Sequence, residues 1–248
     1  MLSNKYFWAL LLLFSVLMGC EEASKSSENT MHLSGSIDGL RKGTVYLQKM
    51  QDSTLVSIDS VVVNGSPKFD FKTEVESPEI YYLSLKKEDG DSLNDRIFFF
   101  GEPDKITINT LLKTFESSAE VIGSKNQILF QEYRKLARQF DSKKLDYIKA
   151  YFEAAKEDGN TDAVDSIQKA MDNLIKRRYL YSLNFASTHG DNVIAPFIVL
   201  TEVYNANVRF LDTVASKLSD RVRESKYGKE LIDFIAERKA AEAAATTP

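Results

Sequence analysis

The chain has 248 residues, of which 43% are hydrophobic and 27% are charged, with 11 Gly and 5 Pro. This composition is that of a folded globular protein and excludes collagen-like, low-complexity and wholly disordered chains. The formal net charge of −4 argues against nucleic acid as a partner, because a protein that binds a phosphate backbone usually carries a basic surface.

The first residues are typical of a secretory signal peptide. Lys5 precedes an apolar run of about a dozen residues, which is shorter than the roughly 20 that a membrane span requires. The run ends in Gly19-Cys20, which is similar to a bacterial lipobox, in which the cysteine thiol accepts a diacylglyceryl group. We expect residues 1–20 to be a lipoprotein signal peptide and Cys20 to anchor the protein in the outer membrane. The alternative is an ordinary signal peptide with a chance cysteine.

Cys20 is the only cysteine, so a lipid-bearing Cys20 leaves neither a free thiol nor a disulfide. Residues 21–30 are polar and predict a flexible tether between the lipid and the first domain. Its acidic start, Glu21-Glu22, resembles the surface-export signal of Bacteroidetes lipoproteins, although it also fits a solvated linker. The sequence therefore leaves open whether the protein faces the periplasm or the cell surface.

Residues 31–123 show the alternation of apolar and polar residues that is typical of strands. Phe69 and Phe71 flank Asp70, for example, and Asn64-Gly65 favours a tight turn. Eight short strands separated by turns predict an antiparallel β-sandwich or an open barrel. The predicted strands span residues 31–37, 44–48, 55–63, 68–72, 80–86, 96–100, 105–109 and 119–122.

After Gly123 the apolar period changes to that of helices. The break at 158–160 separates two long helices, and we expect His189 to face the carbonyl end of the second one. The predicted helices span residues 129–155, 164–185, 193–204, 212–218 and 229–239. The sequence thus predicts an α+β protein with a β-sandwich domain at 31–123, a helical domain at 124–239 and a disordered tail at 240–248.

Several segments together resemble the N-terminal β domain of unknown function of Bacteroidetes lipoproteins that continue into a thioredoxin-like, AhpC/TSA-type domain. The helical stretch that follows is similar to the spacer before that redox domain. Because this sequence holds no second cysteine, the thiol chemistry of those relatives is not expected here. The segments that carry the resemblance are Gly35-Ser36-Ile37-Asp38-Gly39, Gly43-Thr44-Val45-Tyr46-Leu47, Ile58-Asp59-Ser60-Val61, Phe69-Asp70-Phe71, Phe98-Phe99-Phe100-Gly101 and Val121-Ile122-Gly123-Ser124.

Motifs for catalysis are weak. Residues 90–93 read Gly-Asp-Ser-Leu, the block that names one class of lipases and esterases. A serine nucleophile there needs an Asp-x-x-His to supply its base, and neither His32 nor His189 has an Asp three residues before it. Two separated histidines also do not provide a zinc site of ordinary spacing. We therefore expect no enzyme activity, no cofactor and no metal.

Two neighbouring strands carry aromatic residues on both faces, where a simple sandwich should have one polar face. One interpretation is a binding surface for a protein or glycan. The other is that the helical half packs on the outer face and buries it. The residues concerned are Tyr81, Tyr82, Phe98 and Phe100.

These observations predict a non-enzymatic, lipid-anchored envelope protein that serves as a binding or scaffolding module for an envelope protein partner. The alternative is an accessory subunit of a thiol-disulfide redox system that docks to a separate thioredoxin-like protein.

Overall fold

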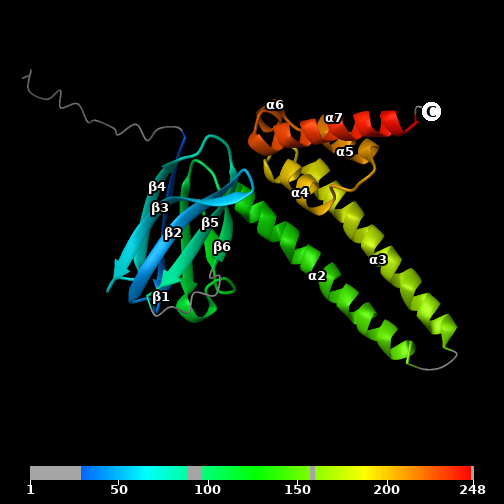
Figure 1. Cartoon of the computed structure of the whole chain (residues 1–248), viewed down its shortest axis with the longest axis horizontal. Helices are drawn as coiled ribbons and strands as arrows, with labels where there is room; N and C mark the ends of the chain where they lie inside the picture. Colours follow the sequence, from blue (N-terminus) through cyan, green and yellow to red (C-terminus); the bar gives the residue numbers. More distant parts are fainter. Residues whose placement is uncertain (1–28, 89–95, 157–159, 247–248) are drawn as a thin grey trace, which may run out of the picture.

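The computed structural model describes residues 29–88, 96–156 and 160–246 of the chain. The predicted signal peptide, Cys20 and most of the predicted tether lie outside these residues, and so do residues 90–93. Within the described part, eight strands precede the long helices (Figure 1). This confirms the predicted α+β class and the order of its two halves.

The strands form two four-stranded sheets that pack face to face (Figure 1). One sheet has the order β4-β1-β7-β8 and the other the order β3-β2-β5-β6. Apolar side chains of both sheets share one core, in which Leu33, Leu47 and Phe99 are fully buried. The strands are β1 (Thr30–Asp38), β2 (Lys42–Gln51), β3 (Thr54–Asn64), β4 (Lys68–Glu74), β5 (Glu79–Lys87), β6 (Arg96–Gly101), β7 (Lys105–Leu111) and β8 (Glu120–Ile122).

The prediction of a purely antiparallel sandwich is wrong at one pair, because β1 and β7 run parallel. These strands are far apart in the chain and are not joined by a hairpin, so nothing forces them to be antiparallel. Gly35 lies opposite Ile108 in this pair. A Cβ atom at Gly35 would overlap the backbone carbonyl of Ile108, which explains the glycine.

The helical half consists of a long hairpin and a compact base. The hairpin helices α2 and α3 run in opposite directions and project away from the sandwich (Figure 1). Ala186, Val199 and Leu231 belong to the apolar core of the base. No helix within the described residues combines the length and the apolar character that crossing a bilayer requires. The helices are η1 (Leu112–Thr114), α2 (Lys125–Ala154), α3 (Thr161–Thr188), α4 (Ile194–Glu202), α5 (Val208–Ser216), α6 (Asp220–Arg223) and α7 (Lys226–Thr246).

Helix α7 differs from the prediction at its end. Residues 240–248 were expected to be a disordered tail, but the helix continues to Thr246. Ile235 is the last buried residue of α7, so packing does not hold the final turns. Alanine has the highest helix propensity, and residues 240–245 are alanine apart from Glu242. Intrinsic propensity therefore accounts for the extension.

The two halves meet through one face of the β5-β6 pair. Ile80 and Phe100 pack there against Phe130 of α2 and Ile198 of α4. Polar contacts join the same surfaces, since the Ile80 N–H donates a hydrogen bond to the Tyr227 hydroxyl over 3.1 Å. The first turns of α2 are thereby fixed against β6. This contact shapes the surface between α2 and the sandwich.

Candidate functional site

The aromatic residues singled out from the sequence lie on opposite faces of the β5-β6 pair. Tyr81 is buried in the sandwich core, with its ring centroid 6.1 Å from that of Phe99. Tyr82, Phe98 and Phe100 lie on the other face, toward the helices. The four predicted residues Tyr81, Tyr82, Phe98 and Phe100 therefore do not form one binding face.

Helical residues bury Phe100 completely. Its ring centroid lies 5.8 Å from that of Phe130, 5.1 Å from Phe197 and 6.4 Å from Tyr227, all in edge-to-face geometry. This packing corresponds to the second interpretation of the aromatic strands, in which the helical half covers them. Phe98 remains half-buried at the margin and borders a groove.

The two histidines occupy different elements. His32 lies in β1, and His189 is the C-terminal cap of α3. Nδ1 of His189 lies 2.8 Å from the carbonyl oxygen of Phe185, and the two rings stack with centroids 4.1 Å apart. His189 thus lies at the helix end as expected. Within the described residues, no three His, Cys, Asp or Glu side chains gather in a way that could hold a metal ion.

A groove of about 830 Å³ lies between the sandwich and the first half of α2. Three segments line it, namely β6, the connection from Lys113 to Val121, and the first half of α2. Its floor is apolar, because Ile97, Phe115 and Phe130 line it and are buried. A concave site with an apolar floor is the usual form of a binding site in proteins.

The rim of the groove carries an excess of positive charge, and we call it the basic groove. Lys113, Arg134, Lys135 and Arg138 line it, whereas Glu116 is the one carboxylate among the lining residues that the structure describes. Of the ion pairs formed within the described residues, none involves these four basic side chains. Because the whole chain has a formal net charge of −4, this local excess is opposite in sign to the molecule.

Arg134 is held over the aromatic floor. Its guanidinium carbon lies 5.1 Å from the centroid of Phe98 and 5.6 Å from that of Phe130, within the range of cation–π attraction. Burial lowers the pKa of Arg134, and the positive charge of Arg138 lowers it further, against the opposing effect of Glu116. A bound anion would relieve the repulsion between the two guanidinium groups.

Gln127 contributes a buried hydrogen-bond donor to the groove. Only 5% of its surface is exposed, and its Oε1 accepts a hydrogen bond from the Phe100 N–H over 3.0 Å. That bond assigns the other side-chain atom as the Nε2 amide, which has no acceptor among the described residues. A buried donor without an acceptor is rare in folded proteins, and this one lines a groove that a ligand can enter.

The start of α2 explains how Gln127 is positioned. Ser124 caps the helix by accepting a hydrogen bond from the Gln127 N–H over 3.0 Å. Gly123 precedes it with φ +112°, and a Cβ atom there would overlap the Lys105 carbonyl oxygen. This close contact with β7 fixes where the helix begins, and Gln127 follows one turn later.

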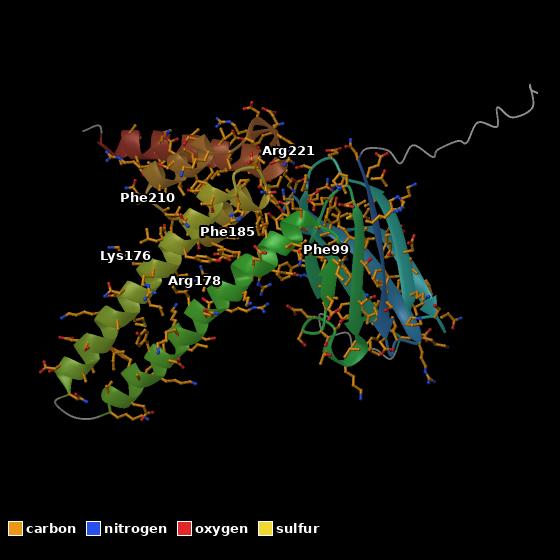
Figure 2. All side chains as sticks on the ribbon, turned by 180° about the vertical axis from the view of Figure 1, so that it is seen from behind. Phe99, Lys176, Arg178, Phe185, Phe210 and Arg221 are labelled. Atoms are coloured by element: carbon orange, nitrogen blue, oxygen red, sulfur yellow. The ribbon has the colours of Figure 1, made fainter. Side chains whose placement is uncertain are left out.

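Arg178 of α3 lies between α2 and α3 (Figure 2). Its guanidinium lies 3.2 Å from Asp141 of α2 and 2.8 Å from Glu202 of α4. Tyr133 lies beside this network and donates or accepts a hydrogen bond with Ser182 over 2.7 Å. Burial raises the pKa of Tyr133 to about 12. Helix α2 is therefore joined to α3 and α4 by this network, next to the face that lines the groove.

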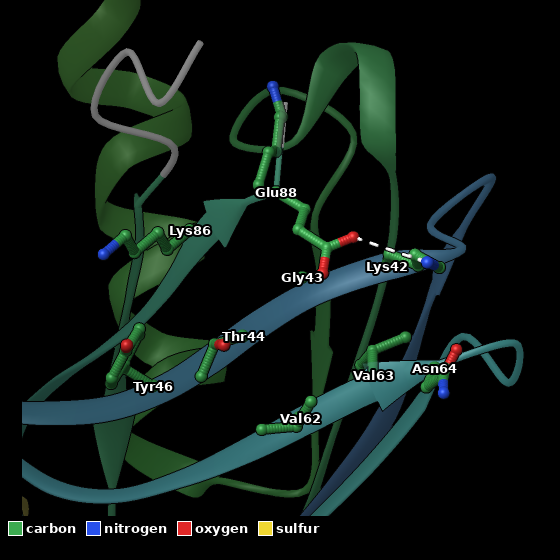
Figure 3. Close-up of a pocket in the computed structure, with 10 residues that line it drawn as sticks. Lys42, Gly43, Thr44, Tyr46, Val62, Val63, Asn64, Lys86 and Glu88 are labelled. Carbon is green, nitrogen blue, oxygen red and sulfur yellow. Dashed lines mark ion pairs between the residues drawn. The ribbon is translucent and has the colours of Figure 1, made fainter. Parts of the chain in front are cut away.

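A second hollow, of about 360 Å³, is lined by residues of β2, β3 and β5 (Figure 3). Tyr46, Val62 and Lys86 line it, and Lys42 forms an ion pair with Glu88 at 3.7 Å at its edge. Its positive charge is thus partly compensated, and the residues around it include no buried polar group. The groove beside α2 is the stronger candidate.

Sequence reasoning missed the groove. Arg134 and Arg138 lie in the helix predicted at 129–155, and Val121 lies in the strand predicted at 119–122, but neither element was expected to line a site. One signal was present in the sequence, namely a seven-residue spacing of polar residues, which places them on one helix face. Gln127 and Arg134 have this spacing, and so do Gln131 and Arg138. That spacing does not reveal which surface α2 faces.

One comparison with known proteins gives a match. Residues 31–130 match the family model described as a domain of unknown function, DUF4369. No curated protein matches the chain. The DUF4369 domain covers the sandwich and the first residues of α2, including Gln127 and Phe130, whereas Arg134 and Arg138 lie beyond it. A domain of unknown function is thus found over the predicted β domain.

Proposed function

We propose that this chain is a non-enzymatic, lipid-anchored protein of the bacterial outer membrane that acts as a binding or scaffolding module. We further propose that the basic groove is where its partner docks. The partner is an envelope protein that presents carboxylate groups beside apolar side chains. Positive charge on the rim and aromatic rings on the floor match such a surface.

The observation that carries this proposal is the combination of uncompensated charge and a buried donor. No ion pair within the described residues involves Arg134 or Arg138, the Gln127 amide Nε2 has no acceptor there, and all three residues line one groove. Gln127 is buried, and buried polar groups are normally paired, so the groove is best explained as completed by a ligand. Its described lining supplies donors and charge with a single carboxylate, which suits binding rather than acid–base chemistry.

The anchoring part of the proposal is supported by the sequence of the first 20 residues. Replacing the thiol should prevent lipid attachment, so we expect Cys20→Ser to move the protein from the membrane fraction to the soluble fraction. The measurement is cell fractionation with immunodetection of the full chain, and Ser3→Ala serves as a control in the same segment. Continued membrane association of Cys20→Ser would contradict the anchor.

The docking part is tested by crosslinking in cells. A photoreactive amino acid placed at Lys135, which is exposed and lines the groove, should capture a partner protein. The same group at Lys68, an exposed position on β4, should not. Identical products from both positions, or none from Lys135, would contradict a partner at the groove. A thioredoxin-like protein captured at Lys135 would indicate the accessory redox role instead of the scaffolding role.

A further inference from the structure

The face of α2 that lines the groove continues beyond it. Gln131 and Arg138 line the groove, and Leu145 and Phe152 follow at the same seven-residue spacing. Seven residues are close to two full turns of an α-helix, so these four side chains lie in one row. We call this row, together with Arg134, the α2 strip. The row spans 21 residues of helix, or about 32 Å.

The outer part of the α2 strip is apolar and uncovered. Leu145 is 58% exposed and Phe152 is 61% exposed, and no residue of α2 after Ala137 is buried. The ribbon shows this part of the hairpin standing clear of the sandwich (Figure 1). Large apolar side chains aligned with a basic groove are the pattern of an interaction surface rather than of scattered surface residues.

We propose that the α2 strip binds a helical, acidic and amphipathic segment of a partner protein, with its carboxylates in the groove and its apolar side chains on Leu145 and Phe152. This inference rests on the proposed function and specifies its ligand. A small anion would occupy the groove alone and would leave the apolar row uncovered. A helical segment of about 21 residues matches the length of the strip.

Charge argues against a second copy of this chain as the occupant. In a two-fold symmetric contact between α2 strips, the basic residues of one copy would meet either the same basic residues or Leu145 and Phe152 of the other. The strip holds no carboxylate to pair with Arg134 and Arg138. The concave position of the groove argues against a lipid surface. The basic residues lie in the angle between the sandwich and α2, where a flat bilayer cannot reach them and the outer row together.

The test compares two probes on the full chain in detergent by fluorescence anisotropy. The long probe is a synthetic peptide of about 21 residues, with glutamates in one half and Leu and Phe at seven-residue spacing in the other. It is made in two versions, one with the acidic half at the N-terminus and one with it at the C-terminus. The short probe is its acidic half alone. We expect Leu145→Ser with Phe152→Ser to weaken the long probe about tenfold or more and to leave the short probe unchanged.

Matched controls are Ile175→Ser with Leu180→Ser on α3, which are 47% and 50% exposed. We expect this control pair to leave both probes unchanged, because neither residue lies on the α2 strip. Unchanged binding of the long probe to the Leu145/Phe152 variant would overturn the inference, as would its equal weakening by the control pair.

The same probes separate the inference from the proposed function. If Arg134→Gln with Arg138→Gln weakens both probes while the Leu145/Phe152 variant binds normally, the groove binds anions and only the extended strip is wrong. If the arginine variant binds both probes like the wild type, the proposed function itself falls. A dimer of the wild type that Leu145→Ser with Phe152→Ser dissociates would identify a second copy as the occupant and overturn the inference.

Discussion

The side chain of Gln127 contacts both halves of the molecule and also lines the groove. Its Oε1 accepts the N–H of Phe100 at the end of β6, where the sheet contacts α2. Its Nε2 lines the groove without a protein acceptor among the described residues. Stability and binding therefore depend on different atoms of the same residue, and two substitutions can separate them.

We expect Gln127→Leu to lower the free energy of unfolding by about 1–3 kcal/mol, because it leaves the buried Phe100 N–H without an acceptor. Gln127→Glu keeps an oxygen for that N–H but replaces the donor with negative charge. We therefore expect it to retain more stability than Gln127→Leu and to weaken the short acidic probe about tenfold or more. The measurements are urea unfolding and fluorescence anisotropy. Unchanged probe affinity in Gln127→Glu would show that the amide does not face the ligand.

Single aromatic residues show what the sequence can and cannot predict at this scale. Alternation along β5 implies that Tyr81 and Tyr82 point to opposite faces, and they do. It does not tell which face another domain covers. The burial of Phe100 comes from Phe197 and Tyr227, which are about 100 residues or more away in the chain, and no local pattern encodes such a contact.

At the scale of elements, all eight predicted strands are present and the two long helices are found, because each has a clear apolar period. Strand direction could not be predicted in the same way. The alternation in β1 and β7 is identical for parallel and antiparallel pairing. The direction follows from the path of the chain through both sheets, and this path is a property of the whole sandwich.

The ends of the helices and the groove are harder to predict from the local sequence than the strands are. The extension of α7 past Ile235 follows from alanine propensity, a weak signal beside the loss of the apolar period. The groove forms because Gly123 and Ser124 set the start of α2 against the sheet, which brings Arg134 beside the Lys113–Val121 connection. The residue types were visible in the sequence, but the docking that brings them together was not.

At the scale of the whole molecule, the sandwich and the helical half are joined by apolar packing with a polar network at its border. Glu79 of β5 is central to this network, since Lys49 of β2 lies 3.3 Å from its carboxylate and Lys226 of α7 also pairs with it. The Lys226 N–H donates a hydrogen bond to Ser77 over 3.0 Å. Helix α7 is thereby tied to the sheet through one carboxylate.

The last prediction compares this carboxylate with an exposed one. The Glu79 side chain is 10% exposed, whereas that of Asp212, which pairs with Lys239 at 2.8 Å, is 53% exposed. We expect Glu79→Ala to lower the free energy of unfolding by about 1–3 kcal/mol, less than for a fully buried pair because both lysines keep contact with water. We expect Asp212→Ala to lower it by less than about 1 kcal/mol. Urea unfolding of the full chain followed by circular dichroism measures both, and equal losses would show that Glu79 does not tie α7 to the sheet.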